Sequence, residues 1–278
     1  MKLTMTRLLV MSDLDGTLLD HYSYDFGSAL EAMTRLESLQ IPLVLNSSKT
    51  FPEMLHIRKA VNNTCPFVVE NGAALYVPVQ QGGREIFECV IFGLTRRDIL
   101  AAMHEIESRH QFEYQAFSRM SVAQLVATTG LGADQAQYAL SRQYTEPLLW
   151  KDSSEHLAEF TAMCNKAGIS VIRGGRFVHL GGAADKSDCM GWLREFYGKR
   201  YCRTPAIIAL GDSENDVPML LNADYAVQVK SPVKQFPDIS HPRLTRTTEI
   251  GPLGWNNSLL HLLDEIEAKR QKKVMNIQ

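Results

Sequence analysis

Residues 7–19 read RLLVMSDLDGTLL, and this stretch decides the fold. The apolar run at 8–11 has the length and composition of a buried strand in a parallel sheet. Asp13 and Asp15 follow it, and Gly16 then turns the chain. Ligands of open α/β sheets bind at the carboxyl ends of such strands. Two acids buried there need a cation, a proton or hydrogen bonds. A plain strand-ending turn is the alternative explanation, because Asp and Gly both favour turns.

The same pattern recurs at both ends of the chain. Strand-like and helix-like segments alternate over residues 1–83 and again over 185–278, which predicts a doubly wound parallel sheet, a Rossmann-like core, with right-handed crossovers. Residues 84–184 mix helices with hairpin-like strands, which predicts an inserted α+β domain with an antiparallel sheet. We therefore predict an α/β fold with a core domain of residues 1–83 and 185–278 and a cap domain of residues 84–184.

Composition excludes several classes of function. A net charge of -2 over 278 residues gives no electrostatic footprint for nucleic acid or an anionic membrane. No stretch has the roughly 20 apolar residues that span a bilayer, and the apolar run at 8–11 is too short for a signal peptide. The cysteines are odd in number and scattered, which favours reduced thiols and a cytoplasmic location.

Four polar clusters are predicted at strand ends or helix starts of the core. They are Asp13 with Asp15; Ser47 with Ser48 and Lys49; Lys186; and Asp212 with Asn215 and Asp216. Phosphoryl transfer through a carboxylate needs these residue types, because one carboxylate attacks phosphorus and a second moves protons. Carboxylate oxygens also bind Mg²⁺, while a hydroxyl and an ammonium hold phosphate oxygens where charge develops.

Individual members of these clusters have alternative explanations. Lys186 opens a predicted helix, where the helix dipole disfavours a cation, so a phosphate-binding role is favoured over a surface lysine. Asp216 either caps the next helix, orients Lys186 or supports the metal. Asn215 is either a metal-supporting residue or a loop former.

In this order, the clusters resemble the four motifs of the haloacid dehalogenase-like phosphatases: DLDGTLL at 13–19, Ser47, Lys186 and GDSEND at 211–216. The resemblance covers nearly the whole chain. It implies that Asp13 is the nucleophile and Asp15 the general acid and base. It also implies that Asp13, the carbonyl of Asp15 and Asp212 bind Mg²⁺.

Other segments resemble particular subgroups of this family. The motif ENGA at 70–73 and the long insertion look like the Cof-type capped subgroup. The segments NSSKT at 46–50, RQYTE at 142–146 and GGRFVH at 174–179 resemble mannosyl-3-phosphoglycerate phosphatases. The residues that this resemblance assigns to substrate binding are Ser48, Lys49, Glu70, Asn71, Arg142, Arg176 and His179. Lys49 replaces the arginine of many Cof-type relatives, and Gln143 replaces a glutamate common in the mannosyl group.

We predict a cytoplasmic, Mg²⁺-dependent phosphatase of a small phosphorylated sugar or glycosyl-phosphoglycerate, with mannosyl-3-phosphoglycerate as the favoured substrate. An alternative enzyme with the same phosphoryl-transfer chemistry is a general sugar-phosphate phosphatase or a phosphomutase. The alternative that is not an enzyme is a regulatory module that accepts phosphate on Asp13 without turnover.

Overall fold

The computed structural model describes residues 8–174 and 176–275. Arg7 and Gly175, which belong to two of the motifs above, lie outside the described residues. The chain divides into two compact units: the first runs up to Asn46 and resumes at Met190, and the second is Ser47–Cys189. These bounds differ from 83/84 and 184/185, so the core and cap domains stay a prediction. Among the described residues, no helix is both long enough and apolar enough to cross a bilayer.

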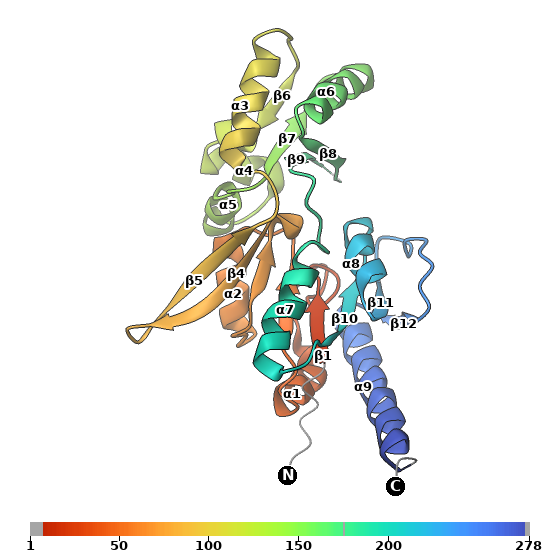
Figure 1. Cartoon of the computed structure of the whole chain (residues 1–278). Helices are drawn as coiled ribbons and strands as arrows, with labels where there is room; N and C mark the ends of the chain where they lie inside the picture. The colour runs from red at the N-terminus through yellow and green to blue at the C-terminus, as the bar shows by residue number, and fades with distance from the viewer. Residues whose placement is uncertain (1–7, 175, 276–278) are drawn as a thin grey trace. The chain divides into compact units, whose positions relative to one another are not determined.

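The first unit contains a parallel sheet (Figure 1). Its strands are β1 (Leu8–Ser12), β2 (Leu43–Asn46), β10 (Ala206–Gly211), β11 (Tyr225–Lys230) and β12 (Leu244–Ile250). They pair in the order β12-β11-β10-β1-β2. β1 is buried along its whole length, as its apolar run predicts. Because Ser12 lies opposite Leu210, the residues after β1 and β10 emerge at the same edge.

The last two helices of this unit pack against that sheet, and its first helix packs against the last. The helices are α1 (Leu30–Ser38), α7 (Cys189–Tyr201, which begins at the last residue of the second unit), α8 (Val217–Asn222) and α9 (Gly251–Met275), with short 3₁₀ turns η1 (Gly27–Ala29) and η4 (Glu214–Asp216). Trp255 of α9 is fully buried and donates its indole N–H to Ser12 Oγ at 2.9 Å. Asn256 accepts the backbone N–H of Ala32 at 2.8 Å. These contacts fix α9 against β1 and α1.

The second unit contains two antiparallel pieces of sheet. One consists of β3 (Phe67–Val69), β4 (Ala74–Gln81) and β5 (Arg84–Ile91). The other has the order β6-β7-β9-β8, from β6 (Tyr114–Ala116), β7 (Glu146–Trp150), β9 (Val178–Gly181) and β8 (Ser170–Arg173). Its helices are α2 (Phe51–Ala60), α3 (Arg96–Glu107), α4 (Val122–Thr129), α5 (Ala133–Leu140) and α6 (Ser154–Lys166), with 3₁₀ turns η2 (Glu70–Gly72) and η3 (Phe117–Arg119).

The helices α3 and α6 bury their apolar faces on the four-stranded sheet (Figure 1). Ile99, Met103 and Phe160 join Leu148 of β7 in one core cluster. A capping box begins each of α2 and α3: Thr50 N–H donates to Glu53 Oε2 at 2.8 Å, and Asp98 N–H donates to Thr95 Oγ1 at 3.3 Å. The fold class is confirmed: a parallel α/β core sheet with an inserted α+β region.

Three local features differ from the sequence-based expectation. β4 and β12 are not predicted as strands, because Pro78 interrupts the first and the second is largely polar. Lys186 does not open a helix, which is a correction, because α7 begins only at Cys189. Asp185 Oδ1 instead accepts the N–H and the hydroxyl of Ser187, which makes residues 185–188 a turn. The helix-dipole argument for Lys186 is therefore wrong.

Candidate active site

Asp13 stands directly after β1, in the first unit, and is almost fully buried. Its backbone N–H donates to Leu210 O of β10 at 3.0 Å. Its carbonyl accepts the hydroxyl of Ser12 at 2.6 Å, and that hydroxyl also accepts the Trp255 indole. The strand pairing and α9 therefore fix the backbone that carries the Asp13 carboxylate.

The turn after Asp13 brings a second aspartate to the same edge. Leu19 N–H donates to Leu14 O at 2.8 Å, which closes the turn and leaves Asp15 half-buried. Gly16 has φ +82°, and a Cβ on it would lie 3.0 Å from Asp212 Oδ2. Gly16 thus supplies both the left-handed backbone and the space beside the Asp212 carboxylate. The hydroxyl of the fully buried Thr17 makes no hydrogen bond to a described residue.

The loop after β10 contributes the other two acids. Asp216 Oδ2 accepts the backbone N–H groups of Asp212 and Ser213 at 3.1 and 3.0 Å. The loop curls so tightly that a Cβ on Gly211 would lie 2.4 Å from Asp216 Cβ. The Asp216 side chain therefore caps η4 and not the following helix α8, where the prediction placed its cap. Asn215 is exposed and accepts the Ser213 hydroxyl at 2.5 Å, a contact within the loop, and its metal-supporting role stays a prediction.

Asp13, Asp212 and Asp216 form a buried carboxylate cluster, whose oxygens lie within 4.8 Å of one another. Burial, and then the negative charge of Asp216, raises the pKa of Asp212. Three carboxylates this close repel one another unless a cation neutralises them. Hard oxygen donors at this spacing fit Mg²⁺, which prefers carboxylate ligands and retained water.

Ser47 and Lys49 lie in the second unit, in the loop that follows β2. The buried Ser47 accepts the N–H of Lys49 on its hydroxyl at 3.3 Å and the N–H of Asn71 on its carbonyl at 3.0 Å. Glu70 N–H donates to Lys49 O at 3.0 Å. Ser48 is half-buried between them. The turn after β3 therefore holds the loop that carries Ser47.

Lys186 is 1% exposed, which is rare for an ammonium group and costly unless it is compensated. The backbone of Asp185 and Lys186 packs directly on Gly72, the end of η2. Gly72 has φ +96°, and a Cβ there would lie 1.9 Å from Asp185 O. Only glycine fits this contact, which fixes the backbone at Lys186 against the turn after β3.

We expect Gly72→Ala to lower the free energy of unfolding by about 3 kcal/mol or more, because the side chain clashes with rigid backbone at a left-handed φ. Urea unfolding followed by circular dichroism measures the change. Gly130→Ala is the matched control: Gly130 also has a positive φ, +80°, but its Cβ would meet nothing within 4 Å. Equal losses in the two variants would contradict the packing explanation.

The predicted substrate residues of the second unit divide into two groups. Glu70, Asn71 and His179 line a cavity of about 30 Å³, large enough for one water-sized group. Arg142 lies 3.8 Å from Glu70, measured from Nη1 to Oε2, and is 11% exposed. Arg176 is exposed and donates to Thr128 O, a contact that does not involve the other four.

His179 is a half-buried histidine that lines this cavity. Burial, and then the positive charge of Arg142, lowers its pKa from 6.5 to about 4. The folded state binds a proton on the His179 imidazole more weakly than the unfolded state does. Above pH 6.5 the imidazole is therefore neutral in both states and costs no stability. Stability is lost as the pH falls from 6.5 toward 4.

We expect this single group to remove about 3 kcal/mol of stability between pH 7 and pH 4. Glu70 also faces the cavity, so the effect of His179 is isolated as a difference between variants. His179→Gln should flatten the dependence of urea midpoints on pH, whereas His56→Gln, which changes an exposed histidine of α2, should leave it unchanged. Parallel pH curves for wild type and His179→Gln would refute this.

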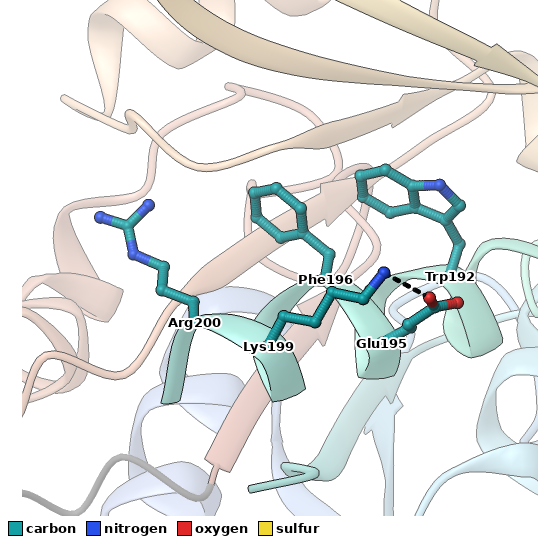
Figure 2. A pocket seen from close by; sticks show the side chains of 5 residues that line it. All are labelled: Trp192, Glu195, Phe196, Lys199 and Arg200. Atoms are coloured by element: carbon teal, nitrogen blue, oxygen red, sulfur yellow. Dashed lines mark ion pairs between the residues drawn. The ribbon is translucent and has the colours of Figure 1, made fainter. Parts of the chain in front are cut away.

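A larger cavity, of about 510 Å³, borders α7 and contains none of the predicted residues (Figure 2). The rings of Trp192 and Phe196 stack with centroids 5.0 Å apart, and Lys199 pairs with Glu195 at 2.6 Å. The spacing of three and four residues places these side chains on one face of the helix. They bring no group of buried acids together, so the carboxylate cluster is the better candidate site.

The sequence assigns no role to two residues around these groups. Gly72 and Thr145 stand within the motifs at 70–73 and 142–146, but they act through contacts with distant segments. Asp216, predicted as a cap, a partner of Lys186 or a metal-supporting residue, belongs to the carboxylate cluster.

Comparisons with known proteins agree with this arrangement. Residues 10–172, more than half of the chain, match the family of haloacid dehalogenase-like hydrolases. A haloacid dehalogenase-like hydrolase from Bacteroides thetaiotaomicron is similar in structure, with a TM-score of 0.65, 18% identity and coverage of 91% of this chain and 98% of that one. A phosphatase of the haloalkanoate superfamily from the same organism has a TM-score of 0.62, 20% identity and coverage of 94% and 97%.

A third similar structure comes from Thermotoga maritima, with a TM-score of 0.62, 18% identity and coverage of 91% of this chain and 96% of the other. At such identities the structures show a shared fold, and the family match supplies the chemistry class. With its paired aspartates after β1 and its acidic loop after β10, the chain belongs to the haloacid dehalogenase-like hydrolases.

Proposed function

We propose that this hydrolase is a Mg²⁺-dependent phosphatase that works through an aspartyl-phosphate. The observation that carries the proposal is the buried cluster of Asp13, Asp212 and Asp216, whose oxygens suit a cation and stand at strand ends where ligands bind. When bound, Mg²⁺ would supply positive charge that lets a carboxylate and a phosphate approach each other. Asp13 and Asp212 are the residues that would hold it, with the Asp15 carbonyl.

In the proposed reaction, the Asp13 carboxylate attacks phosphorus and the bond to the leaving oxygen breaks. Asp15 protonates that oxygen and then takes a proton from the water that hydrolyses the acyl-phosphate. The hydroxyl of Ser47 and the ammonium of Lys186 hold phosphate oxygens as negative charge develops. Ser47 and Lys186 are both buried, and a hydroxyl and an ammonium are the donors that suit phosphate oxygens, which supports these roles.

For the substrate, we propose mannosyl-3-phosphoglycerate, supported by the motifs at 46–50, 142–146 and 174–179 and by Arg142 and His179. A guanidinium recognises a carboxylate with paired hydrogen bonds, and a phosphoglycerate carries one. We also propose that residues 84–184 form the specificity cap. The scattered cysteines, none of which forms a disulfide, accord with the proposed cytoplasmic location.

A phosphate-release screen tests the proposal. The purified chain is incubated with mannosyl-3-phosphoglycerate, glucosyl-3-phosphoglycerate and hexose phosphates, each with Mg²⁺ and with EDTA. We expect Mg²⁺-dependent release, highest with the mannosyl compound. Highest release from hexose phosphates would favour the general sugar-phosphate phosphatase. A transferred phosphate with little release would favour a mutase, and a stable phospho-adduct would favour the regulatory module, which Asp15 argues against.

A further inference from the structure

Glu70 carries a fully enclosed carboxylate at the turn after β3. Its Oε1 accepts the N–H of Gln143 at 2.8 Å, and its Oε2 accepts the N–H of Tyr144 at 3.2 Å and the hydroxyl of Thr145 at 2.5 Å. Glu70 and Asn71 have φ of +50° and +61°, which is costly for residues other than glycine. Such a backbone persists only where surrounding contacts hold it. The three hydrogen bonds to residues 143–145 are contacts of that kind.

Arg142 is joined to this carboxylate through Thr145. Arg142 Nη1 donates to Thr145 Oγ1 at 2.8 Å and lies 3.3 Å from Ser48 O. The Thr145 hydroxyl therefore accepts a hydrogen bond from Arg142 and donates its own proton to the Glu70 carboxylate. The Nε of Arg142 is buried and makes no hydrogen bond to a described residue. One donor of this guanidinium is thus left for a ligand.

The same turn also holds the loop that contains Ser47. Glu70 N–H donates to Lys49 O, and Asn71 N–H donates to Ser47 O, both at 3.0 Å. Glu70 therefore contacts the Ser47 loop through its backbone and the Arg142 loop through its side chain. A change at its carboxylate should alter Arg142 while leaving the backbone contacts to the Ser47 loop in place.

We propose that Glu70 is a positioning residue that sets the Arg142 guanidinium for a carboxylate group on the substrate, and is not itself a ligand contact. To bind the Glu70 carboxylate directly, a substrate hydroxyl would have to displace one of the three donors that already occupy its oxygens. The proposal rests on the proposed phosphatase function and on Arg142 as the residue that recognises the substrate carboxylate.

The first test compares two small substrates that differ in the carboxylate: 3-phosphoglycerate and glycerol 3-phosphate. We expect wild type to prefer 3-phosphoglycerate in kcat/KM. Glu70→Gln should reduce that preference at least about tenfold, through KM for 3-phosphoglycerate, as should Arg142→Gln. The double variant should lose no more than the larger single loss, because both changes remove one interaction.

Glu107→Gln is the matched control. Glu107 is a partly buried glutamate of the same unit that pairs with Arg119, so it loses a comparable charge away from Arg142. We expect its substrate preference to match wild type. Additive losses in the Glu70 and Arg142 double variant, or an unchanged preference in Glu70→Gln, would overturn the proposal.

The second test needs no turnover. The imidazole of His179 is titrated by NMR in wild type, Glu70→Gln and Arg142→Gln, with His179→Asn to assign the signal. If Glu70 holds Arg142, its loss lets the guanidinium move away and the pKa of His179 rises, as in Arg142→Gln. Simple removal of a negative charge would lower it instead, so an unchanged or lower pKa overturns the proposal. If wild type hydrolyses neither compound, the phosphatase function fails while this titration still tests Glu70.

Discussion

Asp13→Asn is expected to abolish phosphate release, with kcat lowered about 10⁴-fold or more, because the amide cannot attack phosphorus. The fold should persist, since Asn has the same shape, and stability should not fall, because the change removes one like charge from the carboxylate cluster. Steady-state phosphate release, with circular dichroism and thermal unfolding on the same samples, measures both properties.

Asp20→Asn is the control for this prediction. Asp20 follows the turn that contains Asp15 and accepts N–H groups of Tyr22 and Ser23 at 3.0 and 2.9 Å, so it caps a loop. We expect near wild-type turnover from it. Substantial turnover by Asp13→Asn would sink the assignment of Asp13 as nucleophile.

Asp212→Asn is expected to move activity and stability in opposite directions. The concentration of Mg²⁺ for half-maximal activity should rise at least about tenfold, because a charged ligand is lost. In the presence of EDTA the melting temperature should rise by a few degrees, because the cluster loses one of its like charges. Scanning calorimetry and a Mg²⁺ titration of turnover measure the two effects.

Glu214→Gln provides the comparison, because Glu214 lies in the same loop but is exposed. It should change neither property. An unaltered Mg²⁺ requirement in Asp212→Asn would show that the carboxylate cluster does not hold the metal. A drop in its melting temperature in EDTA would show that the three carboxylates do not destabilise the metal-free protein by repelling one another.

Much of the fold could be predicted because its signals are local. The apolar run of β1, the capping boxes at Thr50 and Thr95, and the turn at Gly16 each depend on residues a few positions apart. The parallel core and the α+β insertion follow from the order of those elements. β4 is not predicted because Pro78 interrupts its strand-forming residues, and β3 and β5 pair with it on both sides.

For the site as well, the sequence predicts residues that have a local signal and fails for residues whose contacts are distant. Asp13 and Asp212 were identified because each follows a recognisable strand. The turn at Lys186 was misread as a helix start, since the hydrogen bonds of Asp185 that form it leave no clear local pattern. The motif at 174–179 predicts that Arg176 binds substrate together with Arg142, whereas Arg176 donates a hydrogen bond to Thr128 O.

The sequence by itself determined which residues stand at the ends of buried strands, because hydrophobic periodicity and turn chemistry act over short distances. Only the tertiary structure decided which of them meet. Asp216 joins Asp13 because its loop curls over Gly211, and Glu70 reaches Arg142 through Thr145, a residue 75 positions along the chain. Long-range packing and hydrogen bonding make both contacts, and neither has a signature in any short segment.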